Sequence, residues 1–72
     1  MKFTYNISHD ALIGLIIHFS ENQKYNYGAP VHDVVKMLNE NILGSEYDVL
    51  LKLVEEFAAA RYFSISNGNI YT

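Results

Sequence analysis

The chain has 72 residues, of which 50% are hydrophobic and 14% aromatic, and it contains no cysteine. A chain of this length buries about 60% of the surface that its unfolded form exposes, so we expect a single domain over residues 1–72 with a small core. Without cysteine, disulfides, thiolate metal sites and a cysteine nucleophile are excluded. Five basic residues against eight acids give a net charge of −3, which disfavours nucleic acid and anionic membranes as partners.

The most apolar run of the sequence, residues 11–19, is too short to cross a membrane. It is interrupted by His18, and a membrane-spanning helix needs about 20 apolar residues. Asp10 precedes the run, and the basic flank and cleavage site of a signal peptide are missing. We therefore expect a soluble protein without membrane contact, and the cytoplasm is the default compartment.

The N-terminal residues predict a short strand followed by a helix. Phe3, Tyr5 and Ile7 alternate with polar residues, which is the period of a strand with one buried face. Ser8 has the position of the N-cap of a helix over residues 9–22.

This first helix has more apolar residues than one inward face requires. The inward stripe is expected to consist of residues 11, 12, 15, 16 and 19, while Ile13 and Ile17 extend the apolar surface to a second side. Such a surplus suits a helix at the centre of the domain. Alternatively, Ile13 and Ile17 form the seam of a homodimer.

Two further helices are expected after a loop or very short strand that ends at Gly28. Pro30 suits the first position of the second helix, because its missing N–H would have no partner there. Ser45 and Asp48 form a capping-box-like pair at the start of the third helix. This helix is expected to continue to about Arg61, whose charge suits the negative end of a helix.

The clearest local signal is the Asn-Gly pair at residues 67–68, the favoured pair for a type I′ turn. Both flanking segments alternate between apolar and polar residues. The sequence therefore predicts a hairpin whose register pairs Ile65 with Ile70 and Ser64 with Tyr71.

These elements predict an α+β domain, a three-helix bundle with a C-terminal β-hairpin. The last helix carries apolar residues at a spacing of four and then three, followed by two apolar residues where the hairpin starts: Leu50, Val54, Phe57, Tyr62 and Phe63. In this pattern the chain resembles the winged helix-turn-helix domain over roughly residues 8–72. It departs from the family at Arg61, where a glycine often ends the helix, and in the longer connection of residues 39–44.

The resemblance implies that the third helix would be the one presented to DNA, but its outward face is acidic. At about 100° per residue, Asp48, Lys52, Glu55 and Glu56 fall opposite Leu50. Lys52 is spaced to pair with these acids along the helix. The wing, residues 64–72, contains no lysine or arginine to neutralise phosphate.

We therefore predict a small non-enzymatic interaction module that binds a protein partner, expected to be basic, through the third helix and the wing. The predicted binding residues are Asp48, Lys52, Glu55, Glu56, Asn67 and Tyr71. The alternative is a dimeric winged-helix DNA-binding transcriptional regulator that touches phosphate through Lys24, Lys36 and Lys52. A third interpretation is that the acids only form a solvated face.

Catalytic and metal-binding patterns are weak. Ser8, His9 and Asp10 are consecutive, so on a helix their side chains diverge by about 100° and cannot act as a triad. The histidines lack the i, i+4 spacing of a helical metal site. We expect no catalytic residues, no cofactor and no metal.

Overall fold

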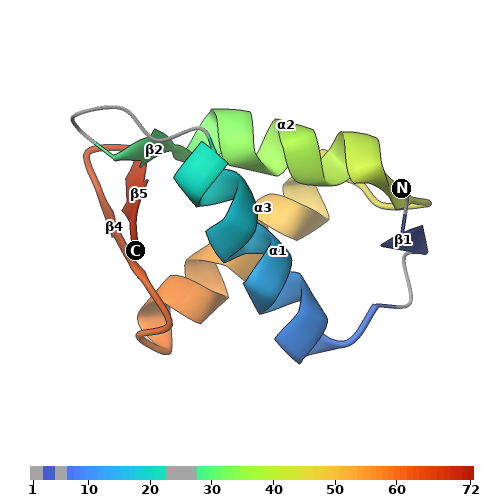
Figure 1. Cartoon of the computed structure of the whole chain (residues 1–72), viewed down its shortest axis with the longest axis horizontal. Coiled ribbons are helices and arrows are strands. Elements are labelled where there is room, and N and C mark those ends of the chain that lie inside the picture. The colour runs from blue at the N-terminus through green and yellow to red at the C-terminus, as the bar shows by residue number, and fades with distance from the viewer. Residues whose placement is uncertain (1–2, 5–6, 23–27) are drawn as a thin grey trace.

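The computed structural model describes residues 3–4, 7–22 and 28–72. The elements follow in the order β1 (Phe3–Thr4), α1 (His9–Asn22), β2 (Ala29–Pro30), α2 (Val31–Asn41), β3 (Ile42–Leu43), α3 (Tyr47–Ala59), β4 (Ser64–Ser66) and β5 (Asn69–Tyr71). Figure 1 shows the helices crossing one another, with β2, β4 and β5 at one end of α2 and β1 at the other. The predicted α+β class is confirmed.

Helix α1 has the predicted bounds, and Ser8 caps it, because the N–H of Ala11 donates to Ser8 Oγ at 3.2 Å. Its buried stripe is turned relative to the prediction, since Ala11 is exposed and Leu15 only half-buried. The buried residues are Leu12, Ile13, Ile16, Phe19 and Ser20. The stripe thus includes Ile13, which had been assigned to a second side.

Of the three helices, α2 has the most deeply buried apolar face. Its residues Val34, Val35 and Leu38 have an exposure of 0%. The helix begins at Val31, so the prediction that Pro30 is its first residue was wrong. Pro30 precedes it in an extended conformation, with φ −58° and ψ 127°, and pairs within the sheet. The N–H of Val31 donates to the carbonyl oxygen of Gly68 at 2.9 Å. The hairpin turn therefore provides a hydrogen-bond acceptor for the start of α2.

Helix α3 begins at Tyr47, after Glu46, and has no side-chain cap. The predicted capping pair of Ser45 and Asp48 was wrong, because Ser45 Oγ lies 2.8 Å from both Asn39 Oδ1 and the carbonyl oxygen of Ile42. The hydroxyl of Ser45 thus holds the connection between α2 and α3 and does not cap the helix.

Helix α3 ends at Ala59 and not at Arg61, which has a positive φ of 70°. The N–H of Arg61 donates to the carbonyl oxygen of Ala58 at 3.0 Å, and that of Tyr62 to the carbonyl oxygen of Phe57 at 3.2 Å. The rings of Phe57 and Tyr62 pack edge to face, with their centroids 6.2 Å apart. This is the Schellman arrangement, with Arg61 in the left-handed position where glycine is usual.

The hairpin has the predicted register, with Ile65 opposite Ile70 and Ser64 opposite Tyr71. Asn67 and Gly68 have positive φ values of 53° and 77°, as a type I′ turn requires.

The strand order of this sheet is β2-β5-β4, with β2 antiparallel to β5. The loop or very short strand that is expected to end at Gly28 falls largely on residues outside the described ranges, and strand β2 directly follows Gly28. Gly28 has a φ of 94°, and a Cβ atom there would lie 2.8 Å from Tyr71 Cε1 and 2.9 Å from the carbonyl oxygen of Ile70. Glycine is needed here for both the conformation and the close approach.

The predicted N-terminal strand is present as Phe3–Thr4, and Tyr5 lies outside the described residues. It pairs in parallel with β3, which places Phe3 opposite Ile42 and Thr4 opposite Leu43. The connection between α2 and α3 is therefore longer than a tight turn because part of it is a strand.

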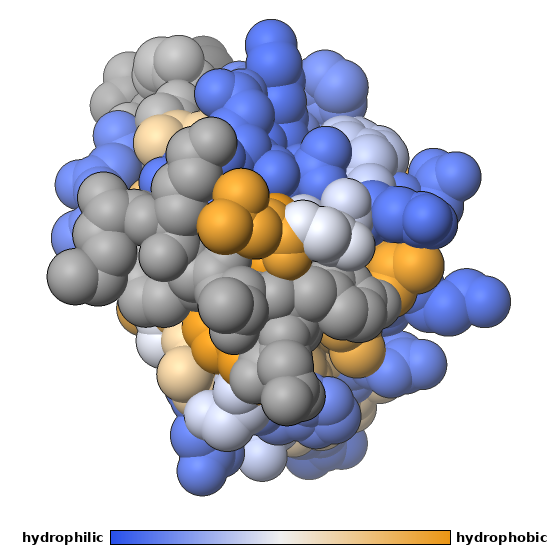
Figure 2. Space-filling model, turned by 90° about the vertical axis from the view of Figure 1, so that its right-hand side faces the viewer, coloured by the Kyte–Doolittle hydropathy of each residue, from blue (hydrophilic) through white to orange (hydrophobic). Residues whose placement is uncertain are grey.

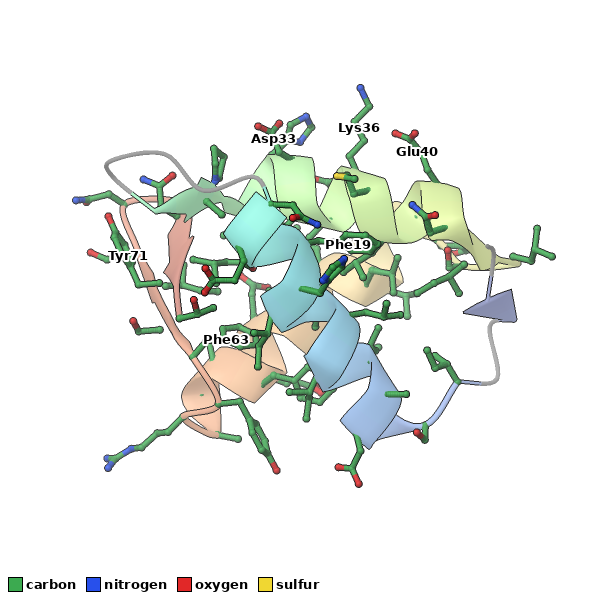
Figure 3. The ribbon with its side chains drawn as sticks, viewed as in Figure 1. Phe19, Asp33, Lys36, Glu40, Phe63 and Tyr71 are labelled. Carbon is green, nitrogen blue, oxygen red and sulfur yellow. The ribbon has the colours of Figure 1, made fainter. Side chains whose placement is uncertain are left out.

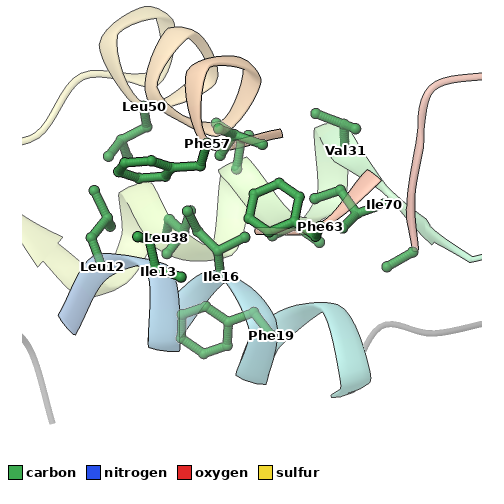
Figure 4. Close-up of a cluster of buried hydrophobic side chains, with 14 of the residues drawn as sticks. Leu12, Ile13, Ile16, Phe19, Val31, Leu38, Leu50, Phe57, Phe63 and Ile70 are labelled. Carbon is green, nitrogen blue, oxygen red and sulfur yellow. The ribbon is translucent and has the colours of Figure 1, made fainter. Parts of the chain in front are cut away.

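The core joins the helices to the hairpin. Figure 4 shows Phe63 between Ile16 and Ile70, and these residues belong to one core cluster with Phe57. The hairpin thus covers the helices, as predicted, through Phe63 at 6% exposure and Ile70 at 2%. None of the helices in residues 7–22 and 28–72 combines the length and hydropathy that a membrane crossing requires.

Candidate functional site

The outward face of α3 is the candidate site, and its orientation is the predicted one. Leu50, Val54 and Phe57 point into the core with exposures of 2%, 0% and 7%. The four predicted binding residues of this helix are exposed: Asp48, Lys52, Glu55 and Glu56. The structure therefore brings these four side chains to one solvent-facing surface, as helical periodicity predicts.

The charge of the protein is concentrated on this helix. With Glu46, which directly precedes it and is also exposed, α3 carries four acids and one lysine, a net charge of −3. The whole chain also has a net charge of −3, so the remaining four acids and four bases cancel. The rest of the sequence is thus neutral in sum, and α3 is the anionic region.

Lys52 does not neutralise its neighbours through direct contact. The sequence predicts that it pairs with Asp48, Glu55 or Glu56, but within the described part of the chain Lys52 forms no ion pair. A long exposed side chain loses rotamer entropy when it is held in one geometry, which offsets the small gain of a surface pair. The carboxylates therefore remain available to another molecule.

The positions of the acids along α3 also matter. Asp48 is in the first turn, where a negative charge is favourable, whereas Glu55 and Glu56 lie toward the end, and the last turn has no basic residue. Acids near the negative end of a helix destabilise it. The negative charge at the C-terminal end of α3 therefore does not serve to stabilise the helix.

The two predicted residues of the wing lie on a separate element from the acids. Asn67 is exposed in the hairpin turn, which touches the start of α2 through Gly68. Tyr71 is 38% exposed, and its ring lies close to the backbone of Gly28. Figure 3 shows Tyr71 on the outer side of the hairpin. Tyr62, with 55% exposure, is a further exposed aromatic residue just before the hairpin, and it is not among the predicted binding residues.

The suggested dimer seam on α1 has little apolar surface to offer. Ile13 is a core residue at 9% exposure, and Ile17 is half-buried against the core. The apolar surplus of α1 is largely absorbed within the chain, because Ile13 belongs to the core cluster and Ile17 packs against it. A second chain would thus find almost none of Ile13 accessible.

The histidines are engaged individually. His18 Nε2 lies 3.1 Å from Asn22 Nδ2, and His32 Nδ1 lies 2.7 Å from the hydroxyl of Tyr47. The second contact links the first turns of α2 and α3, and no local sequence pattern indicates it, because the two residues are 15 positions apart. Among the residues that the structure describes, no three metal-ligating side chains come together.

Comparison of the chain with protein-family models, with curated proteins and with solved structures finds no match. Within the described residues, the fold consists of three helices, a three-stranded antiparallel sheet and the parallel pair of β1 and β3.

Proposed function

We propose that this protein is a non-enzymatic interaction module of winged-helix-like architecture, and that it binds a basic protein partner through the outward face of α3 together with the wing. The observation that carries the proposal is the concentration of the net charge of −3 on α3 and Glu46, in exposed side chains.

Electrostatic complementarity is the main physical basis of this proposal. Several like charges on one helix create a local potential that attracts a partner of opposite charge and raises its association rate. The same potential repels nucleic acid phosphate. Binding of this kind weakens as salt rises, because the Debye length shortens to about 8 Å at physiological ionic strength.

The wing and Tyr62, which lies just before it, are proposed to add apolar contact area. Tyr62 and Tyr71 expose 55% and 38% of their surface, and tyrosine is among the residue types that contribute most to binding energy at protein interfaces. Asn67 adds an exposed amide at the hairpin turn.

The second candidate function is a winged-helix DNA-binding regulator. The element order favours it, because α3 is followed directly by the β4–β5 hairpin, as in the family that the sequence resembles. The charge of α3 disfavours it. Of the lysines proposed to touch phosphate, Lys36 and Lys52 are exposed, and Lys24 lies outside the described residues.

One binding experiment separates the two candidates. A fluorescent decalysine peptide and a fluorescent random duplex are each titrated with the wild-type protein over a range of salt concentrations. We expect binding of decalysine that weakens with salt, and no retention of duplex. Duplex binding that falls steeply with salt and weakens further in Lys52→Glu would instead support the regulator.

The double variant Glu55→Lys/Glu56→Lys then tests whether α3 is the surface. Its control is Asp33→Lys/Glu40→Lys, which makes the same change in net charge on α2, where Figure 3 shows both acids pointing away from the core. We expect the α3 variant to lose at least about ten times more affinity for decalysine than the α2 variant. Equal losses would show that decalysine responds only to net charge, and would contradict the proposal.

A further inference from the structure

A small apolar hollow lies between the start of α1, β3 and α3. Its volume is about 140 Å³, and it is lined by Ile7, His9, Leu12, Ile42, Leu50 and Leu53. Three of these residues, Leu12, Ile42 and Leu50, are buried core residues, whereas Ile7 and Leu53 are half-buried and His9 is exposed. The hollow thus runs from the core to the surface.

The size and lining of the hollow indicate what fits in it. An apolar cavity of about 150 Å³ in a protein accepts one benzene molecule, so this hollow has room for a single side chain of the size of leucine or phenylalanine. Five of its six lining residues are aliphatic. His9 lies at the exposed side and packs edge to face on Phe57, with ring centroids 5.5 Å apart. An apolar occupant is therefore favoured.

The surface next to the hollow is also apolar. Val49, which lies four residues before Leu53, is 36% exposed. Residues four apart on a helix are neighbours, so Val49 extends the wall that Leu53 forms. Figure 2, which views the molecule from the side of β1, shows patches of apolar surface on this face.

Carboxylates border the hollow along α3. Glu46 lies four residues before Leu50, and Glu56 lies three residues after Leu53, so each is about one helical turn from a lining residue. Both acids are exposed. An occupant that brought negative charge would be repelled here, and one that brought positive charge would be attracted.

We infer that this hollow is the anchor site for the protein partner, and that it receives one large apolar side chain flanked within a few residues by lysine or arginine. The inference rests on the proposed function, because it names the partner chemistry for the same helix. The apolar side chain would bury its surface against Leu12, Leu50 and Leu53, while its basic neighbours meet Glu46 and Glu56. Interfaces commonly combine such a buried anchor with a charged rim.

Two synthetic peptides of equal charge test the inference. Each has a central residue between two pairs of lysines, phenylalanine in one peptide and alanine in the other. Their affinities are measured by fluorescence anisotropy, and their contacts by amide shifts in ¹⁵N NMR spectra. We expect the phenylalanine peptide to bind about tenfold more tightly, as burial of a large apolar side chain implies, and to shift the amides of Leu12, Leu50 and Leu53.

Filling the hollow should remove that preference. Leu53→Phe adds a ring to its wall, and Leu15→Phe is the matched control, since Leu15 is a half-buried leucine of α1 that does not line the hollow. We expect the tenfold preference to vanish in Leu53→Phe and to persist in Leu15→Phe. If Leu53→Phe does not fold, His9→Trp covers the exposed side of the hollow, and the same loss is expected.

The outcomes for the anchor site and for the proposed function can be told apart. Equal affinities of the two peptides for the wild-type protein would overturn the anchor site, as would a preference that survives filling of the hollow. The proposed function fails separately if Glu55→Lys/Glu56→Lys leaves the affinity of both peptides unchanged.

Discussion

Helices α1 and α3 have similar core-facing sides and different solvent-facing sides. Both bury apolar residues at a spacing of four and then three, namely Leu12, Ile16 and Phe19 in α1 and Leu50, Val54 and Phe57 in α3. The outer side of α1 includes Ala11, Gly14 and His18, whereas that of α3 is dominated by charged residues. The comparison teaches that the inner spacing determines the packing and leaves the outer side free to carry a binding function.

Both helices are destabilised by residues that lie within them or just beyond their ends. In α1 the residue is Gly14, which is exposed and lies in the middle of the helix along the chain. In α3 they are Glu56, near the negative end, and Arg61, in the left-handed position just beyond the end. The unfavourable residue of α1 has no side chain to offer a partner, while those of α3 are charged and exposed. Of these residues, only Glu56 has the charge that the proposed binding of a basic partner needs.

The largest expected effect tests whether the inner faces are equivalent. Phe57→Ala and Phe19→Ala each remove a ring that is less than 10% exposed in the folded chain, and each should cost about 3–5 kcal/mol of unfolding free energy. Urea unfolding followed by circular dichroism measures both. A large loss in only one of the two variants would break the equivalence of the helices.

The next effect concerns the outer side of α1. A Cβ atom added at Gly14 would meet no atom within 4 Å, so Gly14→Ala should stabilise the protein by about 0.8–1 kcal/mol through helix propensity alone. The gain should appear as a higher midpoint of thermal unfolding. A loss of stability would mean that the outer side of α1 needs glycine for another reason.

A smaller gain is expected at the end of α3. Arg61→Gly relieves the left-handed strain but makes the unfolded chain more flexible, which leaves a net stabilisation of about 0.5–1 kcal/mol. Chemical unfolding measures this difference. If the variant is instead less stable, the Arg61 side chain contributes contacts that outweigh its backbone strain.

The smallest expected effect tests the contribution of the helix dipole to the stability of α3. Glu56→Gln should stabilise the protein by roughly 0.3 kcal/mol at low salt, because it removes a charge from the unfavourable end of α3. Asp48→Asn should destabilise it by a similar amount, since Asp48 is in the first turn. Both effects should fade in 1 M salt. Equal signs for the two variants would argue against the helix dipole as the cause.

The elements that local signals specify could be predicted from the sequence. Ser8 caps α1, and the Asn-Gly pair at residues 67–68 sets the hairpin register, because each depends on residues only a few positions apart. The start of α3 could not be predicted in the same way. Ser45 has the chemistry of a helix cap, but its hydroxyl is held by the α2–α3 connection.

Features that depend on distant residues were missed. Strands β2 and β3 have two residues each, too few to show a period, and their partners lie far along the chain. The outward face of α3 was predictable because it lies opposite a clear apolar stripe. The hollow was not, since its walls come from the start of α1, from β3 and from α3.

The hydrogen bond from Val31 to Gly68 has a consequence for local motion. The first amides of a helix have no acceptor within the helix and exchange readily with solvent, but that of Val31 is covered by the hairpin turn. Its hydrogen exchange rate should therefore follow the detachment of the wing, and not the fraying of α2. A single amide in the middle of the sequence would thus report how often the C-terminal hairpin lifts away from the helices.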